Sequence, residues 1–186
     1  METKQKHNHK GKTSEKLLDK FKIVNELPLS KGMNVLDAGC GDGYMSVMFA
    51  EAVGETGKVY ASDIDKNSIE IIKTENKLKN LEPSVQNITT KTTFPDHSMD
   101  FIYLSTVIHG FSQAQRQGFI SEIKRLLKPN GFLAILEIKK EPMPFGPPQE
   151  IRLSPDDLKN LFSFIVLKTV DLNQHFYLQI FKNEDI

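Results

Sequence analysis

The residues best suited to chemistry lie in the run Val35-Leu36-Asp37-Ala38-Gly39-Cys40-Gly41-Asp42-Gly43. An apolar segment leads to an acid, and three glycines follow at alternate positions. Glycine tolerates positive φ and lets a ligand come close to backbone N–H groups. A second acid, Asp63, follows the next strand-like run, residues 58–62. A glycine turn with an acid at the end of the following strand is typical of a site for an adenosine-containing ligand, in which the acid binds the ribose hydroxyls.

The spacing of the glycines separates two classes of ligand. A dinucleotide site has the pattern G-x-G-x-x-G, whereas here the third glycine, Gly43, comes one residue early and Tyr44 occupies the expected position. The carboxylate of Asp37, just before the turn, would repel a pyrophosphate but suits a cation. The pattern therefore speaks against a nucleotide-cofactor oxidoreductase, which we keep as an alternative.

Length and composition restrict the class of protein. The chain has 186 residues, 39% hydrophobic and 26% charged, with a formal net charge of zero. This composition predicts one globular domain over residues 14–186, preceded by a flexible basic tail at 1–13. Zero net charge argues against nucleic acid as a partner.

Cysteine content and hydropathy narrow the class further. The sequence contains one cysteine, which excludes an internal disulfide and a multi-cysteine metal site, and we expect no metal. No apolar run is long enough for a membrane span, so we expect no membrane insertion and a cytoplasmic location.

The elements that must position these residues alternate between strand and helix. We expect strands at 33–37, 58–62, 85–88 (weak), 100–107 and 132–138, and helices from a cap at Ser14, near 43–53, near 66–79 and over 113–127. Pro129-Asn130-Gly131 predicts a tight turn before the strand at 132–138. Strands that alternate with helices predict right-handed βαβ units and a parallel sheet.

The C-terminal part changes character. Residues 141–148 contain four prolines and are expected to form a loop. A short helix follows Ser154-Pro155, and two strand-like runs, 164–172 and 176–181, are joined by a short loop. A short loop joins antiparallel strands, so the last strand is expected to be antiparallel in the sheet.

Several of these segments resemble one known family. The D-x-G-x-G-x-G arrangement from Asp37 to Gly43 resembles motif I of the class I S-adenosylmethionine (SAM) dependent methyltransferases. The runs Phe94-Pro95-Asp96-His97-Ser98-Met99-Asp100 and Arg125-Leu126-Leu127-Lys128-Pro129-Asn130-Gly131 are similar to segments of the methyltransferases related to ubiquinone/menaquinone biosynthesis. The resemblance implies an α/β fold, a Rossmann-like three-layer αβα sandwich with strand order 3-2-1-4-5-7-6 and strand 7 antiparallel.

The resemblance also implies roles for individual residues toward SAM. The glycines Gly39, Gly41 and Gly43 would line the cofactor together with Cys40, a small packed residue of the turn. The other positions implied to bind the cofactor are Asp37 near its methionine part, Asp63 on both ribose hydroxyls, Ile64 on the adenine, and Ser105 beneath the sulfonium. The family often has an acid after strand three that binds the adenine, and the aligned segment here, Ile88-Thr89-Thr90, has none.

His109 is the candidate catalytic residue, as a general base. It follows the fourth strand at the carboxyl end, where open α/β sheets place their ligands, and imidazole exchanges protons near neutral pH. The alternative is a histidine that shapes the pocket or caps the next helix. Methyl transfer needs a base only when the nucleophile carries a proton.

Four further residues and one loop are weighed as parts of the substrate pocket. Glu137 and the loop at 141–148 are candidates to close over the substrate, with a rigid connector as the alternative for the loop. Tyr177 and His175 either face the pocket or pack at the edge of the sheet, and His97 is expected to be solvated.

These observations together predict an enzyme that transfers a methyl group from SAM to a small-molecule acceptor. A small acceptor is expected because the sequence offers little beyond the core fold. A non-catalytic SAM-binding or partner subunit is the second alternative, and the outer edge of the sheet permits a homodimer.

Overall fold

The computed structural model of the chain describes residues 18–184, in which one seven-stranded sheet has the order β3-β2-β1-β4-β5-β7-β6. The strands are β1 (Asn34–Ala38), β2 (Lys58–Asp63), β3 (Leu81–Val85), β4 (Met99–Ser105), β5 (Leu127–Ile138), β6 (Ile165–Asp171) and β7 (Phe176–Lys182). Neighbouring strands are parallel except that β7 is antiparallel to both β5 and β6. The predicted fold class, strand order and antiparallel strand 7 are therefore confirmed.

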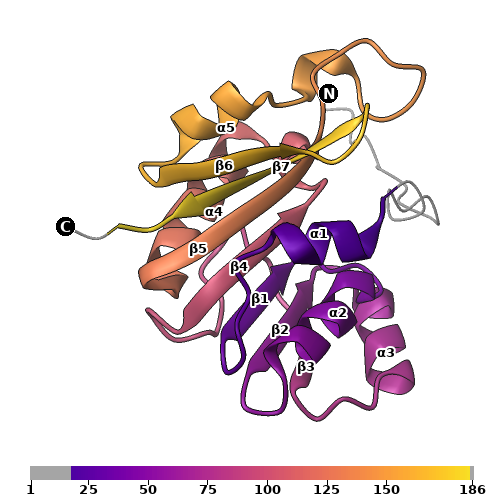
Figure 1. Cartoon of the computed structure of the whole chain (residues 1–186), viewed down its shortest axis with the longest axis vertical. Coiled ribbons are helices and arrows are strands. Elements are labelled where there is room, and N and C mark those ends of the chain that lie inside the picture. The colour runs from indigo at the N-terminus through magenta and orange to yellow at the C-terminus, as the bar shows by residue number, and fades with distance from the viewer. Residues whose placement is uncertain (1–17, 185–186) are drawn as a thin grey trace, which may run out of the picture.

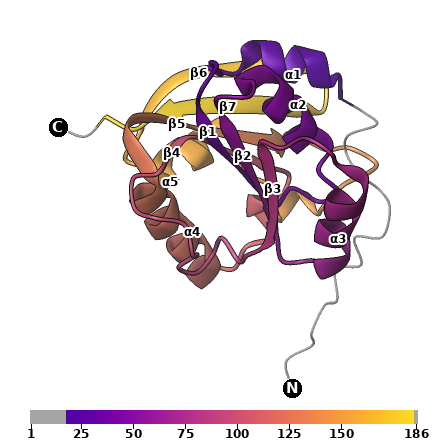
Figure 2. The same ribbon diagram turned by 90° about the horizontal axis from the view of Figure 1, so that it is seen from below.

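Helices cover both faces of the sheet (Figures 1 and 2). They are α1 (Lys20–Glu26), α2 (Tyr44–Val53), α3 (Lys66–Glu75), α4 (Gln113–Leu126) and α5 (Pro155–Leu161), with short 3-10 turns at Ile108–Gly110 and Gln149–Ile151. The apolar residues of α1, α2 and α3 share one core with one face of the sheet, and those of α4 and α5 share another core with the opposite face. None of the helices in residues 18–184 is long and apolar enough to cross a bilayer.

Side-chain caps mark where α1, α4 and α5 begin. Asp19 accepts hydrogen bonds from the second and third backbone N–H groups after it and so starts α1. The cap expected at Ser14 lies outside the described residues, as does the basic tail at 1–13. Ser112 and Ser154 each form a reciprocal capping box, with Gln115 and Asp157 respectively.

The third helix is shorter than the sequence indicates. α3 ends at Glu75 rather than near 79, because Asn76 is extended (φ −83°, ψ 135°) and its side-chain oxygen accepts from the Leu78 N–H at 3.0 Å. A local bond from an asparagine side chain competes with helix continuation.

The third strand lies earlier than expected. The sequence favours 85–88, whereas β3 covers Leu81–Val85 and includes Pro83. A proline argues against an inner strand but is tolerated at an edge, and β3 pairs with β2 alone. A strand that contains Pro83 is possible only because of its place at the edge of the sheet, which local sequence patterns do not reveal.

The expected tight turn at Pro129-Asn130-Gly131 is part of β5, which begins at Leu127 instead of 132. Opposite β4 the register jumps from Met99↔Leu127 to Phe101↔Phe132, so the extra residues form an irregular bulge. Asn130 has φ +62°, and Asn130 and Gly131 exchange backbone bonds with Asn183 at 2.8 Å. The left-handed conformation of Asn130 is the one that a turn would require. Pairing with Asn183, after β7, nevertheless keeps the segment in the sheet.

Candidate functional site

The glycine turn links β1 to α2 and is bound to the end of β2. The N–H groups of Gly39 and Cys40 both donate to the Ser62 carbonyl oxygen, at 2.7 and 3.0 Å. Gly39, Gly41 and Gly43 all have positive φ, a conformation that other residues rarely adopt. The backbone of the turn is therefore held at the carboxyl edge of the sheet, between its two neighbouring strands.

Two of the glycines are required for different reasons. A Cβ on Gly43 would lie 2.8 Å from Cγ1 of Ile72 in α3, so this position must be glycine for the helices to pack. A Cβ on Gly41 would meet no atom within 4 Å. Gly41 therefore leaves open space beside the backbone, which is what a cradle for a ligand requires.

Asp63 lies beside this open space, at the end of β2. One carboxylate oxygen accepts from the Gly41 N–H at 3.0 Å and the other from the Asp65 N–H at 2.8 Å. A carboxylate has about four acceptor positions, so two remain for the hydroxyls of a ribose. Ile64 follows and is 72% exposed, an unusual position for a large apolar side chain and suited to stack on a flat ring.

Asp37 and Cys40 lie deeper. Asp37 is 3% exposed and accepts from the Ser46 hydroxyl of α2 at 2.5 Å, so it orders the junction of the turn and the helix. Burial raises the pKa of the Cys40 thiol well above its ordinary value, and the nearby Asp37 raises it further. The thiol is therefore protonated and is not a nucleophile.

The segment after β3 lies next to the end of β2. The Gln86 N–H donates to the Asp63 carbonyl oxygen at 3.0 Å, and Asn87 accepts from both the N–H and the hydroxyl of Thr89. Helix α4 comes close to this segment because Gly118 has no Cβ, which would otherwise lie 2.1 Å from the Thr89 carbonyl oxygen. This segment carries Ile88-Thr89-Thr90, and residues 86–90 contain no acid.

The residues after β4 complete the carboxyl edge. Ser105 ends β4 and is half-buried, and His109 lies in the 3-10 turn that follows. Nδ1 of His109 is 2.8 Å from Oε2 of Glu137, which lies on the neighbouring strand β5. The sequence singled out both residues but did not pair them.

The terminal hairpin contributes packing at this edge. Tyr177 is 1% exposed and donates to the Leu153 carbonyl oxygen at 2.7 Å. Burial, and then the neighbouring Glu137 carboxylate, raise the pKa of Tyr177 well above its ordinary value. Tyr177 is therefore a neutral donor that packs inside the sheet. His175 stacks edge-on against Phe145 of the proline-rich loop, with ring centres 4.8 Å apart.

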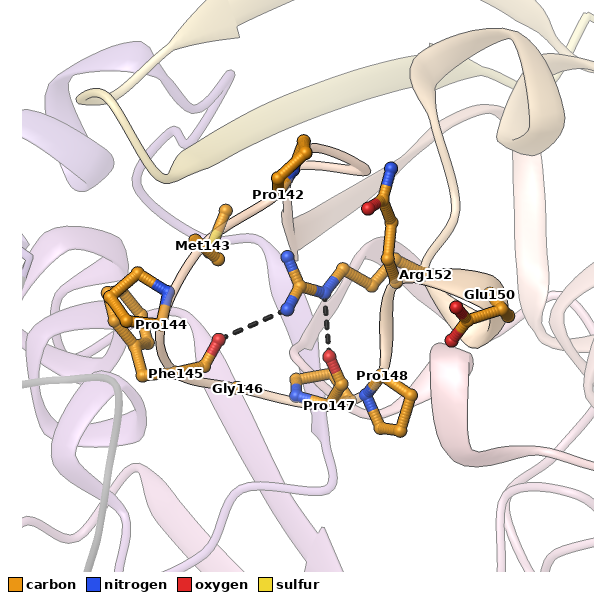
Figure 3. Close-up of a pocket in the computed structure, with 10 residues that line it drawn as sticks. Pro142, Met143, Pro144, Phe145, Gly146, Pro147, Pro148, Glu150 and Arg152 are labelled. Carbon is orange, nitrogen blue, oxygen red and sulfur yellow. Dashed lines mark hydrogen bonds between the residues drawn. The ribbon is translucent and has the colours of Figure 1, made fainter.

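The proline-rich loop folds around Arg152 (Figure 3). Arg152 is 3% exposed, and its guanidinium donates to the carbonyl oxygens of Lys139, Glu141, Phe145 and Pro147, at 2.7 to 3.3 Å. The loop surrounds a hollow of about 460 Å³. Because one buried cation holds three carbonyls of the loop and the Lys139 carbonyl just before it, the loop is a tied structure and not a loose flap.

Two of these features escaped sequence reasoning. The pairing of His109 with Glu137 needed the adjacency of β4 and β5, and the available signal was a lone acid in the apolar run 132–138. The role of Arg152 had no signal beyond an isolated arginine after the prolines. His97 is exposed, as expected, and its Nδ1 lies 3.0 Å from the Leu127 carbonyl oxygen.

Comparisons with known proteins agree with this geometry. Residues 35–131, more than half of the chain, match the family model described as "Methyltransferase domain". The chain is 30% identical to a SAM dependent methyltransferase from Aquifex aeolicus, covering 93% of this chain and 94% of that one with a TM-score of 0.80.

Two curated relatives match over a smaller part of their length. The chain is 31% identical to the "Ubiquinone/menaquinone biosynthesis C-methyltransferase UbiE" of Francisella tularensis subsp. novicida, over 67% of this chain, and 27% identical to a demethylmenaquinone methyltransferase of Staphylococcus aureus, over 66%. It spans 50% of the length of each. The glycine turn, Asp63 at the end of β2 and the strand order of the sheet agree with the family match. The chain is therefore a member of the methyltransferase-domain family.

Proposed function

We propose that this protein binds SAM at the glycine turn and transfers its methyl group to a small-molecule acceptor, releasing S-adenosylhomocysteine. The observation that carries the proposal is the junction of Gly41 and Asp63. It combines open space above a left-handed backbone with a carboxylate that keeps two acceptor positions. Bound SAM would supply an activated methyl group on a sulfonium that is a good leaving group.

The roles of the chain's own residues follow from their places. Gly39, Gly41 and Gly43 would let the cofactor come close to the backbone, with Cys40 packed beneath the turn. Ile64 would pack on the adenine ring, and the threonine and asparagine groups after β3 would take the place of the missing acid. Ser105 would lie near the sulfonium, at the end of β4. Asp37 would favour the cationic methionine part over a phosphate.

His109 is proposed as the base that receives the acceptor's proton. Support comes from its position after β4 and from the Glu137 contact, which orients the ring. Replacing the imidazole, in His109→Gln, should lower methyl transfer far more than SAM affinity. Equal losses of both would contradict the assignment and leave His109 as a residue that shapes the pocket.

The proposal of a small acceptor rests on the elements beside Glu137 and on the names of two relatives. The loop at 141–148, tied by Arg152, and the β6–β7 hairpin are the elements beside Glu137 that could wall a small pocket. Two relatives are named for methylation of small quinone-type molecules, although the chain spans half their length. We therefore propose a small-molecule acceptor, with residues 14–186 acting as one domain.

Two other functions can be separated from methyl transfer by one binding experiment. A non-catalytic SAM-binding subunit would keep the glycine turn and Asp63. A nucleotide-cofactor oxidoreductase would bind NAD instead, although Asp37 and Tyr44 disfavour it. Thermal unfolding with SAM, S-adenosylhomocysteine and NAD separates them, since a ligand specific to the native state raises the melting temperature. Stabilisation by NAD alone would overturn the proposal, and stabilisation by SAM without methyl transfer to any fraction of a metabolite extract would favour the non-catalytic subunit.

We further propose a homodimer and a cytoplasmic location. The edge strand β6 leaves Ile165 and Leu167 each 48% exposed, which supports pairing with a second copy. The unpaired Cys40 thiol suits a reducing compartment. Light scattering coupled to size exclusion measures the first proposal, and a monomeric mass at micromolar concentration would contradict it.

A further inference from the structure

Glu137 is a costly residue for the interior of this sheet. Its side chain is fully buried in β5, where its neighbours along the strand, Leu136 and Ile138, are apolar. Within residues 18–184, His109 is its one ion-pair partner, and Oε1 makes no hydrogen bond. The nearby Tyr177 hydroxyl donates to the Leu153 carbonyl oxygen instead. A buried carboxylate with unfilled acceptor positions destabilises a fold. Its presence therefore points to a role other than folding.

The pairing fixes the chemistry of the histidine ring. When the Glu137 carboxylate is ionised it only accepts hydrogen bonds, and Nδ1 of His109 then carries the proton across the 2.8 Å contact. In the neutral ring Nε2 then holds a lone pair. Nε2 makes no hydrogen bond to any described residue, and 12% of the His109 side chain stays exposed. Nε2 is thus available as an acceptor of a hydrogen bond or a proton.

We propose that Glu137 is a positioning residue that holds His109 ready to accept a proton through Nε2, and that the methyl acceptor therefore carries a hydrogen on its nucleophilic atom. The acceptor class is a hydroxyl compound, an N–H compound or an acidic C–H compound. Thioethers and tertiary amines are excluded because they have no proton to give. This inference rests on the proposed methyl transfer.

The step balances without a further reactant. The bond from the methyl carbon to sulfur breaks as the bond from that carbon to the acceptor's oxygen, nitrogen or carbon forms. The acceptor's proton moves to Nε2 of His109, and the positive charge passes from the sulfonium to the imidazolium. The Glu137 carboxylate stabilises that imidazolium through the Nδ1 hydrogen bond, and the proton then leaves to water.

The first test observes the ring directly and needs no acceptor. Long-range ¹H–¹⁵N NMR of the full chain with bound S-adenosylhomocysteine, above neutral pH, reports which nitrogen of His109 is protonated, and His109→Gln assigns the signal. We expect the proton on Nδ1 in the native chain and a changed signal in Glu137→Gln. A proton on Nε2, or on both nitrogens at every pH, would overturn the proposal.

A matched control separates positioning from a general loss of structure. Glu122 is also a buried glutamate, at 4% exposure, but it bonds to Thr92 and Arg125 on another part of the molecule. Glu122→Gln should lower stability and leave the His109 signal unchanged. A similar change of the signal in both variants would mean that Glu137 acts only through the fold.

The second test uses methyl transfer from CD₃-labelled SAM into a metabolite extract. We expect Glu137→Gln to lower the rate by about 10- to 100-fold, with SAM affinity kept, and to have no further effect in the His109→Gln background. Losses that multiply in the double variant would contradict action through His109. Mass spectrometry of the product should show a label on an atom that carried hydrogen, and a labelled sulfonium or quaternary ammonium would overturn the inference. Absence of SAM binding would instead refute the proposed function, and the same NMR measurement on the ligand-free chain would then decide the positioning role.

Discussion

Gly43→Ala should mainly lower the stability of the protein, whereas Gly41→Ala should mainly lower its affinity for SAM. Both residues have positive φ, +85° and +55°. An alanine in this conformation costs about 1–2 kcal/mol. At Gly43 the new Cβ would also lie 2.8 Å from Cγ1 and 2.9 Å from Cδ1 of Ile72, a side chain that is 2% exposed and has little room to move. Overpacking of this kind adds about 1–3 kcal/mol.

Gly43→Ala should therefore lower the free energy of unfolding by about 2–5 kcal/mol in total. For a domain of this size that corresponds to a fall in melting temperature of about 4–20 °C. Gly41→Ala carries the conformational cost alone, about 1–2 kcal/mol, because no atom lies within 4 Å of its Cβ. That Cβ would project into the proposed cradle, so SAM affinity should fall at least about tenfold, or about 1.4 kcal/mol.

Urea unfolding followed by circular dichroism measures the first quantity, and calorimetric titration with SAM measures the second. The expected pattern is a large loss of stability in Gly43→Ala and a large loss of affinity in Gly41→Ala. Equal losses of stability in the two variants would refute the packing argument. Unchanged SAM affinity in Gly41→Ala would refute the assignment of the open space to the cofactor.

Three other predictions concern charge and reactivity. Asp63→Asn should weaken SAM binding by about 10- to 100-fold, since bonds to a charged group are worth about 1.5–3 kcal/mol, and calorimetry with an unchanged affinity would contradict the ribose contact. The hydrogen bond from Lys140 lowers the pKa of Asp157 to about 2 in the folded state. A depressed folded pKa stabilises above the unfolded value of about 4, so unfolding in urea should show stability lost as the pH falls from about 4 to 2, and less of that loss in Asp157→Asn. Cys40, which is buried and protonated, should react with a thiol reagent only as fast as the protein unfolds, and rapid labelling of the native chain would contradict its burial.

Local patterns predicted much of the architecture because each pattern has a local cause. The alternation of apolar strands and amphipathic helices indicated the parallel sheet, and the short link before Phe176 indicated the antiparallel strand β7. Ser154-Pro155 marked the start of α5 because a cap and a proline act within one turn.

The errors came from effects that act across the sheet. Pro83 looks unsuitable for a strand until its place at the edge is known, and Pro129-Asn130-Gly131 looks like a turn until it pairs with Asn183. The expected helix to 79 ended early because of a side-chain bond at Asn76.

The same distinction holds for the candidate site. The glycine turn and Asp63 are visible because they lie in one continuous βαβ unit with fixed spacing. The His109–Glu137 contact joins residues 28 positions apart, one in the 3-10 turn after β4 and the other on β5. The carbonyl cluster around Arg152 depends on the path of a loop. Neither has a spacing rule, because tertiary packing alone brings those atoms together.

Calorimetric titration of the intact protein with SAM, and in parallel with NAD, tests the central proposal most directly. We expect one SAM bound per chain, displaced by S-adenosylhomocysteine, and no measurable heat from NAD. Binding of NAD, or the absence of SAM binding by a chain that is folded by circular dichroism, would contradict it.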